Sequence, residues 1–162
     1  MDTHDVIARY GGVYEHSPWV AERVSALGVD TSDVALLADI MADIVDNAAS
    51  EQQLELIRAH PDLAGKAQVA GELTADSTAE QASAGLDQCS QEEFERFQAL
   101  NTAYHDKFGF PFVMAVRDSS RDEILEAFTQ RLENDYELEF ETALVEIHKI
   151  ARLRLEAMEQ EA

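Results

Sequence analysis

Basic residues are scarce in this chain of 162 residues, which has twelve lysines and arginines against thirty-three aspartates and glutamates. The resulting formal net charge of −21 repels phosphate backbones and therefore argues against binding of DNA or RNA. The sequence leaves two explanations of this acidity open. One is an adaptation to a salty cytoplasm, and the other is simply well-solvated helix faces.

Long hydrophobic runs are also absent, since none approaches the ~20 apolar residues that a membrane helix needs. The first residues show no basic region followed by an apolar stretch, so no secretory signal is expected. A single cysteine, Cys89, excludes an internal disulfide framework and a zinc site built from several cysteines. Together these absences predict a cytoplasmic protein that has no membrane contact.

Helix signals, in contrast, recur along the chain. Ser50, Ser90 and Ser120 each stand three residues before a glutamine or glutamate, which is the pattern of a capping box at a helix N-terminus. Ser17 is a further expected N-cap, and Gly28 is expected to end the helix that follows it. These signals divide the chain into many short helices.

Apolar residues recur at three- and four-residue spacing from Ser32 to about Ala48, and a last long helix is predicted from about Asp135 to Glu159. Only residues 110–116, FPFVMAV, resemble a strand, and no partner strand is evident. We therefore predict an all-α fold: a single compact helical domain over residues 1–162, with about seven to nine helices and one buried extended segment near 110–116.

His60 stands directly before Pro61, at the point where an amphipathic segment ends. Proline disfavours the helical conformation of the residue before it, so the imidazole should leave the last turn of the helix. The negative end of the helix favours a protonated imidazole, and a pKa near neutrality would suit acid–base catalysis. The structural alternative is a histidine that only caps the free carbonyls of the helix.

Ser77 and Glu80 also have the spacing of a capping box, with Gly85 as the residue that ends the helix. In the structural interpretation, Glu80 only reaches back to the Ser77 amide. In the functional interpretation, the helix N-terminus faces a ligand and Glu80 orients either that ligand or His60. A carboxylate beside a histidine also raises its basicity.

The C-terminal helix carries an arginine on an otherwise apolar face. That face consists of Phe140, Leu144, Ile147, Ala151, Arg154 and Met158. A buried guanidinium requires an anionic partner, which could be a structural Asp or Glu or a substrate carboxylate. The neighbouring Arg152 falls off this face and should point to solvent.

Metal and phosphate motifs are missing. The histidines show no His-x-x-x-His or His-x-x-Glu-His pattern, and there is no glycine-rich phosphate loop or Gly-x-Ser-x-Gly elbow. We therefore predict no metal, and a site made of scattered His and Glu is the minor alternative.

Taken in order, several stretches resemble the OHCU decarboxylase family. They are YGGVYEHSPWVAE, LELIRAHPDLAGK, LTADSTAEQASAGL, FQALNTAYHDKFGFPFVMAVR, RDEILEAFTQRLEND and ALVEIHKIARLRL, and they cover nearly the whole chain. The family acts on 2-oxo-4-hydroxy-4-carboxy-5-ureidoimidazoline, the last unstable intermediate between urate and (S)-allantoin.

The resemblance implies roles for individual residues. It makes His60 and Glu80 catalytic and has Pro61 line the pocket. It implies substrate contacts by Ser77, Glu80, Gln81, Arg154 and the backbone of Phe112, Val113, Met114, Ala115 and Val116. The segment 112–116 would then be extended so that its peptide groups remain free for a ligand rich in amides.

The activity implied is decarboxylation of a small ureidoimidazoline without a cofactor, in a cytoplasmic homodimer. Two rival functions remain open. The chain could be a non-enzymatic helical binding domain, in which His60 and Glu80 are caps. It could also be a lyase or hydrolase that acts on a related ureido compound.

Overall fold

A computed structural model describes residues 3–64, 74–117 and 119–161 of the chain. These residues form eight α-helices and one 3₁₀ helix and no strand, which confirms the all-α prediction. None of the described helices is long and apolar enough to cross a membrane. The chain divides into two compact units, Met1–His60 with Ile147–Ala162, and Pro61–Glu146. The single domain over residues 1–162 stays a prediction.

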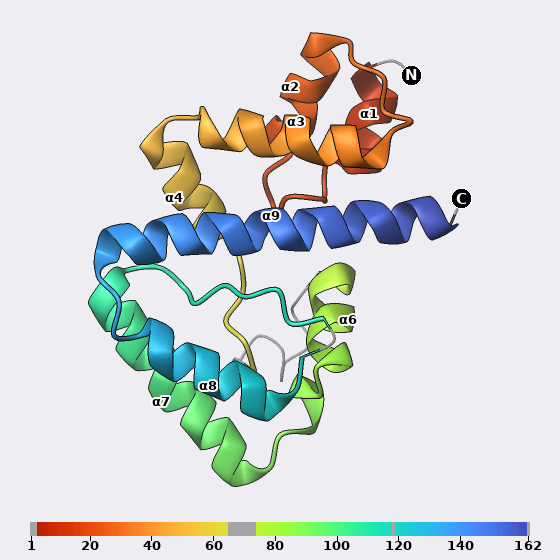
Figure 1. The fold of residues 1–162 in the computed structure, drawn as a ribbon. Coiled ribbons are helices and arrows are strands. Elements are labelled where there is room, and N and C mark those ends of the chain that lie inside the picture. The colour runs from red at the N-terminus through yellow and green to blue at the C-terminus, as the bar shows by residue number, and fades with distance from the viewer. Residues whose placement is uncertain (1–2, 65–73, 118, 162) are drawn as a thin grey trace. The chain divides into compact units, whose positions relative to one another are not determined.

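The first unit is built from helices of both ends of the chain (Figure 1). They are α1 (Thr3–Tyr10), α2 (Trp19–Leu27), α3 (Val34–Asp46), α4 (Ser50–Arg58) and the C-terminal part of α9 (Tyr136–Glu161). Helix α2 contacts both α1 and α3. The buried faces have the predicted helical spacing, with Leu37, Met41 and Val45 fully buried on α3.

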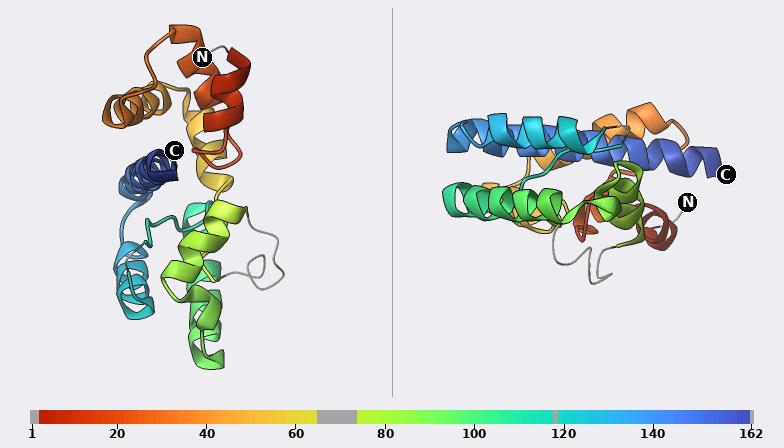
Figure 2. Two further views of the ribbon diagram at one scale, coloured as in Figure 1. Left: turned by 90° about the vertical axis from the view of Figure 1, so that its right-hand side faces the viewer. Right: turned by 90° about the horizontal axis from the view of Figure 1, so that it is seen from below.

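The second unit contains α6 (Ala75–Ser83), the 3₁₀ helix η1 (Leu86–Gln88), α7 (Gln91–Phe108), α8 (Arg121–Arg131) and the N-terminal part of α9. Helices α7 and α8 lie side by side (Figures 1 and 2). The core of this unit is aromatic. Around the ring of Tyr104 lie those of Phe108, Phe110, Phe112 and Phe128, at centroid distances of 4.5 to 5.8 Å.

The chain between α7 and α8 confirms the predicted extended segment. Residues 111–116 belong to no helix and to no strand. Phe112 is fully buried and stacks on Phe128 with a centroid distance of 3.9 Å. Met114 and Ala115 are the partly exposed residues of this otherwise buried stretch.

Two of the predicted capping boxes are present. The Oγ atoms of Ser90 and Ser120 accept from the amides of Glu93 and Glu123, and each glutamate accepts in return from the serine amide. Gly28 ends α2 as predicted, with a left-handed φ of 65° that glycine adopts without strain. Local sequence patterns therefore identified these helix ends.

Two other predicted caps are wrong. The hydroxyl of Ser17 is buried and donates to the carbonyl of Glu15 at 3.0 Å, while α2 begins after Pro18. Ser50 is the first residue of α4 rather than its cap. The side chain of Gln53, which was expected to reach back to Ser50, instead donates from Nε2 to the carbonyl of Val45 at 2.9 Å. In both cases another acceptor competes for the side chain.

These assignments predict a difference between two serine variants. Ser120→Ala removes a cap acceptor and should lower the free energy of unfolding by about 1 kcal/mol. Ser50→Ala, at an exposed position without a capping bond, should change it by less than about 0.5 kcal/mol. Urea denaturation followed by circular dichroism measures both, and equal losses would contradict the cap assignment.

Candidate active site

The imidazole of His60 lies just beyond the end of α4. Its Nδ1 donates to the carbonyl of Leu56 at 2.9 Å, so one ring nitrogen caps the helix, as the structural alternative predicted. Because a carbonyl only accepts, Nδ1 carries the proton and Nε2 is the basic atom of the neutral ring. Among the described residues Nε2 has no hydrogen-bond partner. The second nitrogen therefore remains available for chemistry.

Burial lowers the pKa of His60 to about 4. The Leu56 carbonyl and the Glu15 carboxylate act in the opposite direction and raise this pKa, while Arg154 and His16 lower it further. The expectation of a protonated imidazole is therefore wrong, because the loss of solvation outweighs the helix end. At pH 7 the ring is neutral.

Arg154 has the anionic partner that its buried position requires. Its Nη2 donates to Oε2 of Glu15 at 2.8 Å, with the two side chains 5% and 2% exposed. Its Nη1 donates to the carbonyls of Gly12 at 3.2 Å and Val13 at 3.4 Å. Of the two partners left open by the sequence, the structure shows the carboxylate of the protein itself. Arg152 is exposed, as predicted.

A second contact from α9 fixes the loop that carries Glu15. The hydroxyl of Tyr14 donates to Nδ1 of His148 at 2.8 Å, and Nε2 of His148 donates to Asp46 at 2.9 Å. Burial, together with the charge of Asp46, raises the pKa of Tyr14, which therefore stays protonated. The loop between α1 and α2 is thus held at two neighbouring points.

Ser77 does not cap α6. The N-cap is Thr74, whose Oγ1 accepts from the amide of Ser77 at 3.2 Å, so the predicted box of Ser77 and Glu80 is wrong. Helix α6 begins one turn earlier than expected, because Thr74 is an equally suitable cap. Ser77 is buried within the first turn, and Glu80 is half-buried on the second.

The buried amide of Gln81 joins α6 to the loop that follows His60. Its Oε1 accepts from the amide of Ala64 at 2.9 Å, and its Nε2 donates to the carbonyl of Asp62 at 3.2 Å. From α7, Nδ2 of Asn101 donates to the carbonyl of Leu63 at 3.0 Å. Residues 62–64 are therefore fixed by side chains of two helices.

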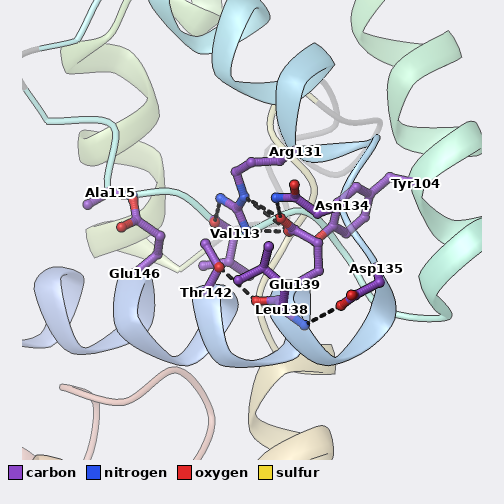
Figure 3. Close-up of polar contacts among 10 residues, drawn as sticks. All are labelled: Tyr104, Val113, Ala115, Arg131, Asn134, Asp135, Leu138, Glu139, Thr142 and Glu146. Carbon is purple, nitrogen blue, oxygen red and sulfur yellow. Dashed lines mark hydrogen bonds and ion pairs between the residues drawn. The ribbon is translucent and has the colours of Figure 1, made fainter.

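The extended segment is held by two charged side chains (Figure 3). Nη1 of Arg131 donates to the carbonyl of Val113 at 2.6 Å, and the amide of Ala115 donates to Oε1 of Glu146 at 3.2 Å. The expectation that the peptide groups of this segment are all free is therefore wrong for these two groups. Neither charged residue was identified from the sequence.

Arg131 is itself fixed by Glu139, which is fully buried. Nη2 of Arg131 donates to Oε2 of Glu139 at 2.9 Å. The same carboxylate also accepts from Tyr104 at 2.6 Å and from Asn134 at 2.9 Å. The guanidinium lies over the ring of Phe112, 4.3 Å from its centroid. All three nitrogens of this guanidinium thus donate within the protein, and the group also lies over an aromatic ring.

The predicted site residues fall in both units. His60 and Arg154 belong to the first unit; Pro61, Ser77, Glu80, Gln81, Phe112, Val113, Met114, Ala115 and Val116 belong to the second. Pairing of His60 with Glu80 therefore stays a prediction. The described residues include no group of three or more His, Cys, Asp or Glu side chains that could hold a metal ion.

A family model for OHCU decarboxylase matches residues 1–156. The chain belongs to the OHCU decarboxylase family. It is 46% identical over 155 residues to the 2-oxo-4-hydroxy-4-carboxy-5-ureidoimidazoline decarboxylase of Haloferax volcanii, covering 96% of this chain and 89% of that protein. The resemblance drawn from the sequence motifs is confirmed.

Two solved structures are similar in fold to this chain. A crystal structure of (S)-allantoin synthase has a TM-score of 0.76 and 33% identity, over 97% of this chain and 50% of that one. A crystal structure of OHCU decarboxylase in the presence of (S)-allantoin has a TM-score of 0.74 and 25% identity, over 91% and 95% of the two chains. The helical fold described above is thus that of the family.

The low pKa of His60 predicts a pH dependence of stability. The folded value of about 4 lies below the ~6.5 of an unfolded histidine, so the unfolded state binds the extra proton between these values. The free energy of unfolding should therefore fall as the pH is lowered through this window. The fall should be steeper than in His60→Asn by up to about 1.4 kcal/mol per pH unit. Urea denaturation from pH 7 to 4 measures it, and parallel curves for both proteins would contradict it.

The Glu15–Arg154 pair predicts a large effect of a conservative change. Glu15→Gln removes the negative charge beside a buried guanidinium and should lower the free energy of unfolding by about 3 kcal/mol. Glu156→Gln breaks an exposed pair with Arg152 and should cost less than about 1 kcal/mol. Similar losses in urea denaturation would show that the buried pair is not special.

Proposed function

We propose that this chain is a carboxy-lyase that converts 2-oxo-4-hydroxy-4-carboxy-5-ureidoimidazoline to (S)-allantoin, the last step of urate degradation. Family membership over residues 1–156 carries the proposal. The similarity to the Haloferax volcanii decarboxylase and to a structure obtained with (S)-allantoin supports it.

The substrate's own chemistry makes a cofactor unnecessary. A hydroxyl and a carboxylate share one ring carbon, and the ureido group is on the next. When the bond to the carboxylate breaks, carbon dioxide leaves and the electron pair moves through the conjugated ring to a ring nitrogen, which takes up a proton from the solvent. The hydroxyl loses its proton to become a carbonyl, and the carbon that bears the ureido group gains a proton. The protein has to orient the carboxylate and move one proton.

His60 is the residue proposed to move that proton. The Leu56 carbonyl fixes Nδ1–H, so Nε2 is the atom that reacts. A ring that burial keeps neutral at pH 7 is ready to accept the hydroxyl proton first and to return it, as imidazolium, to the ring carbon. Delivery to one face gives the (S) enantiomer, whereas spontaneous decay gives the racemate.

The remaining roles concern binding. We propose that Glu80 holds the imidazole or the ureido group, and that Ser77 and Gln81 contact the ring and the ureido group. The Gln81 amide, although bonded to the loop, keeps one N–H and one lone pair for a ligand. Pro61 lines the pocket, and the peptide groups of residues 112–116 bind the ring.

We propose two roles for Arg154, of which the structural one has more support. Its ion pair with Glu15 favours a structural role, in which it fixes the loop whose carboxylate acts electrostatically on His60. A direct contact with the substrate carboxylate is the second role. Too tight a grip on the departing carboxylate would stabilise the ground state and slow the reaction.

Location and assembly follow from the same family resemblance. We propose that the enzyme is a cytoplasmic homodimer. Its ligand is the small ureidoimidazoline substrate, and it binds no nucleic acid and no membrane. The strong negative charge supports the exclusion of nucleic acids, because it repels phosphate groups.

The assay generates the substrate in place from urate, with uricase and hydroxyisourate hydrolase, and follows the optical activity of allantoin. The parent chain should form (S)-allantoin rapidly, and His60→Asn should be slower by about 10²- to 10⁴-fold because the proton carrier is lost. His105→Asn is the matched control, since His105 is exposed and paired with Asp62. Equal traces with and without the parent protein would overturn the decarboxylase proposal and favour a binding domain.

A further inference from the structure

The side-chain amide of Gln81, on α6, is bound twice to the backbone of residues 62–64. Its Oε1 accepts from the amide of Ala64, and its Nε2 donates to the carbonyl of Asp62. Since the oxygen and one N–H are both bonded to this segment, they lie on the side of the amide that faces it, and the second N–H points away. The position of the segment therefore sets the direction of that second donor.

Two side chains of α7 bind the same segment. Nδ2 of Asn101 donates to the carbonyl of Leu63 at 3.0 Å, and Nε2 of Gln98 donates to the carbonyl of Ala64 at 2.8 Å. Asn101 and Gln98 are about one helical turn apart and lie on the same face of α7. Each backbone carbonyl of residues 62–64 is thus bonded to a side-chain amide, and all of these residues belong to the second unit.

The arrangement is kept at two local costs to stability. Ala64 has a φ of 51°, in the left-handed region that residues other than glycine rarely occupy. Oδ1 of Asn101 is buried without a hydrogen-bond partner among the described residues, and an unpaired buried acceptor is destabilising. Strained residues of this kind cluster at active sites, where the surrounding contacts hold them in place.

We propose that Gln98 and Asn101 are positioning residues of the reaction: they hold residues 62–64, which orient Gln81 so that its second N–H meets a carbonyl oxygen of the substrate. This inference rests on the proposed function. It gives two residues of α7 a part in substrate binding that requires no contact with the substrate, and it makes Gln81 a donor to the ligand.

The kinetic test replaces an amide by a side chain of similar length that cannot donate. Gln98→Met leaves the Ala64 carbonyl without its partner and should raise KM roughly fivefold while kcat changes by less than about twofold, because ground state and transition state lose the same hydrogen bond. Gln98→Lys keeps an N–H donor and should retain a KM within about twofold of the parent value. Gln91→Met makes the same change at an exposed position of α7 and should match the parent.

A double-mutant cycle separates a positioning role from a purely structural one. Gln81→Met removes the proposed donor itself and should raise KM at least as far as Gln98→Met does. If Gln98 acts through Gln81, the double variant should have the KM of Gln81→Met, whereas independent effects would multiply. Asn101→Leu, alone and combined with Gln81→Met, should give the same pattern.

NMR spectroscopy of the side-chain amide of Gln81 supplies a readout that does not depend on turnover. In the parent, these NH₂ signals should shift when (S)-allantoin is added. The shift should be smaller in Gln98→Met, because the amide is no longer held in the binding orientation.

The outcomes separate the two proposals. A parent chain without decarboxylase activity would overturn the proposed function, and this inference with it. With an active parent, an unchanged KM in Gln98→Met or multiplied effects in the cycle would overturn the inference alone. Gln81 signals that (S)-allantoin leaves unchanged in the parent would overturn it as well.

Discussion

Both units depend on the pairing of charges that are buried along α9. Glu139 is fully buried and is neutralised by Arg131, and Arg154 is buried and is neutralised by Glu15. An ion removed from water loses several kcal/mol of solvation, which only close and well-oriented partners can offset. In each pair the guanidinium also binds backbone carbonyls of an irregular segment. The buried charges therefore determine where those segments lie, as well as stabilising the helices.

Helices could be predicted from the sequence because their signals are local. Apolar spacing gave the buried faces of α3 and α9, and the serines at 90 and 120 gave two helix starts. The same serine pattern failed at Ser50 and Ser77. In one case Gln53 is bound to the end of α3, and in the other Thr74 caps the helix first. A local pattern does not reveal which of two competing partners a side chain will find.

The site was predictable in part for the same reason. His60 before a proline and Arg154 on an apolar face are visible as local exceptions to a pattern. Glu15 is not, because any of thirty-three acidic residues could have been the partner of that arginine, and the two lie 139 positions apart. The direction of the His60 pKa shift was also missed. The helix end is a local property, whereas burial depends on the whole fold.

The extended segment before α8 has a consequence for how this enzyme can vary. Every residue except proline offers the same N–H and C=O, so the hydrogen bonds available at position 114 do not depend on which side chain is there. Sequence drift at that position leaves these hydrogen-bonding groups in place. A ligand bound to these groups would therefore lose few contacts through single substitutions at that position.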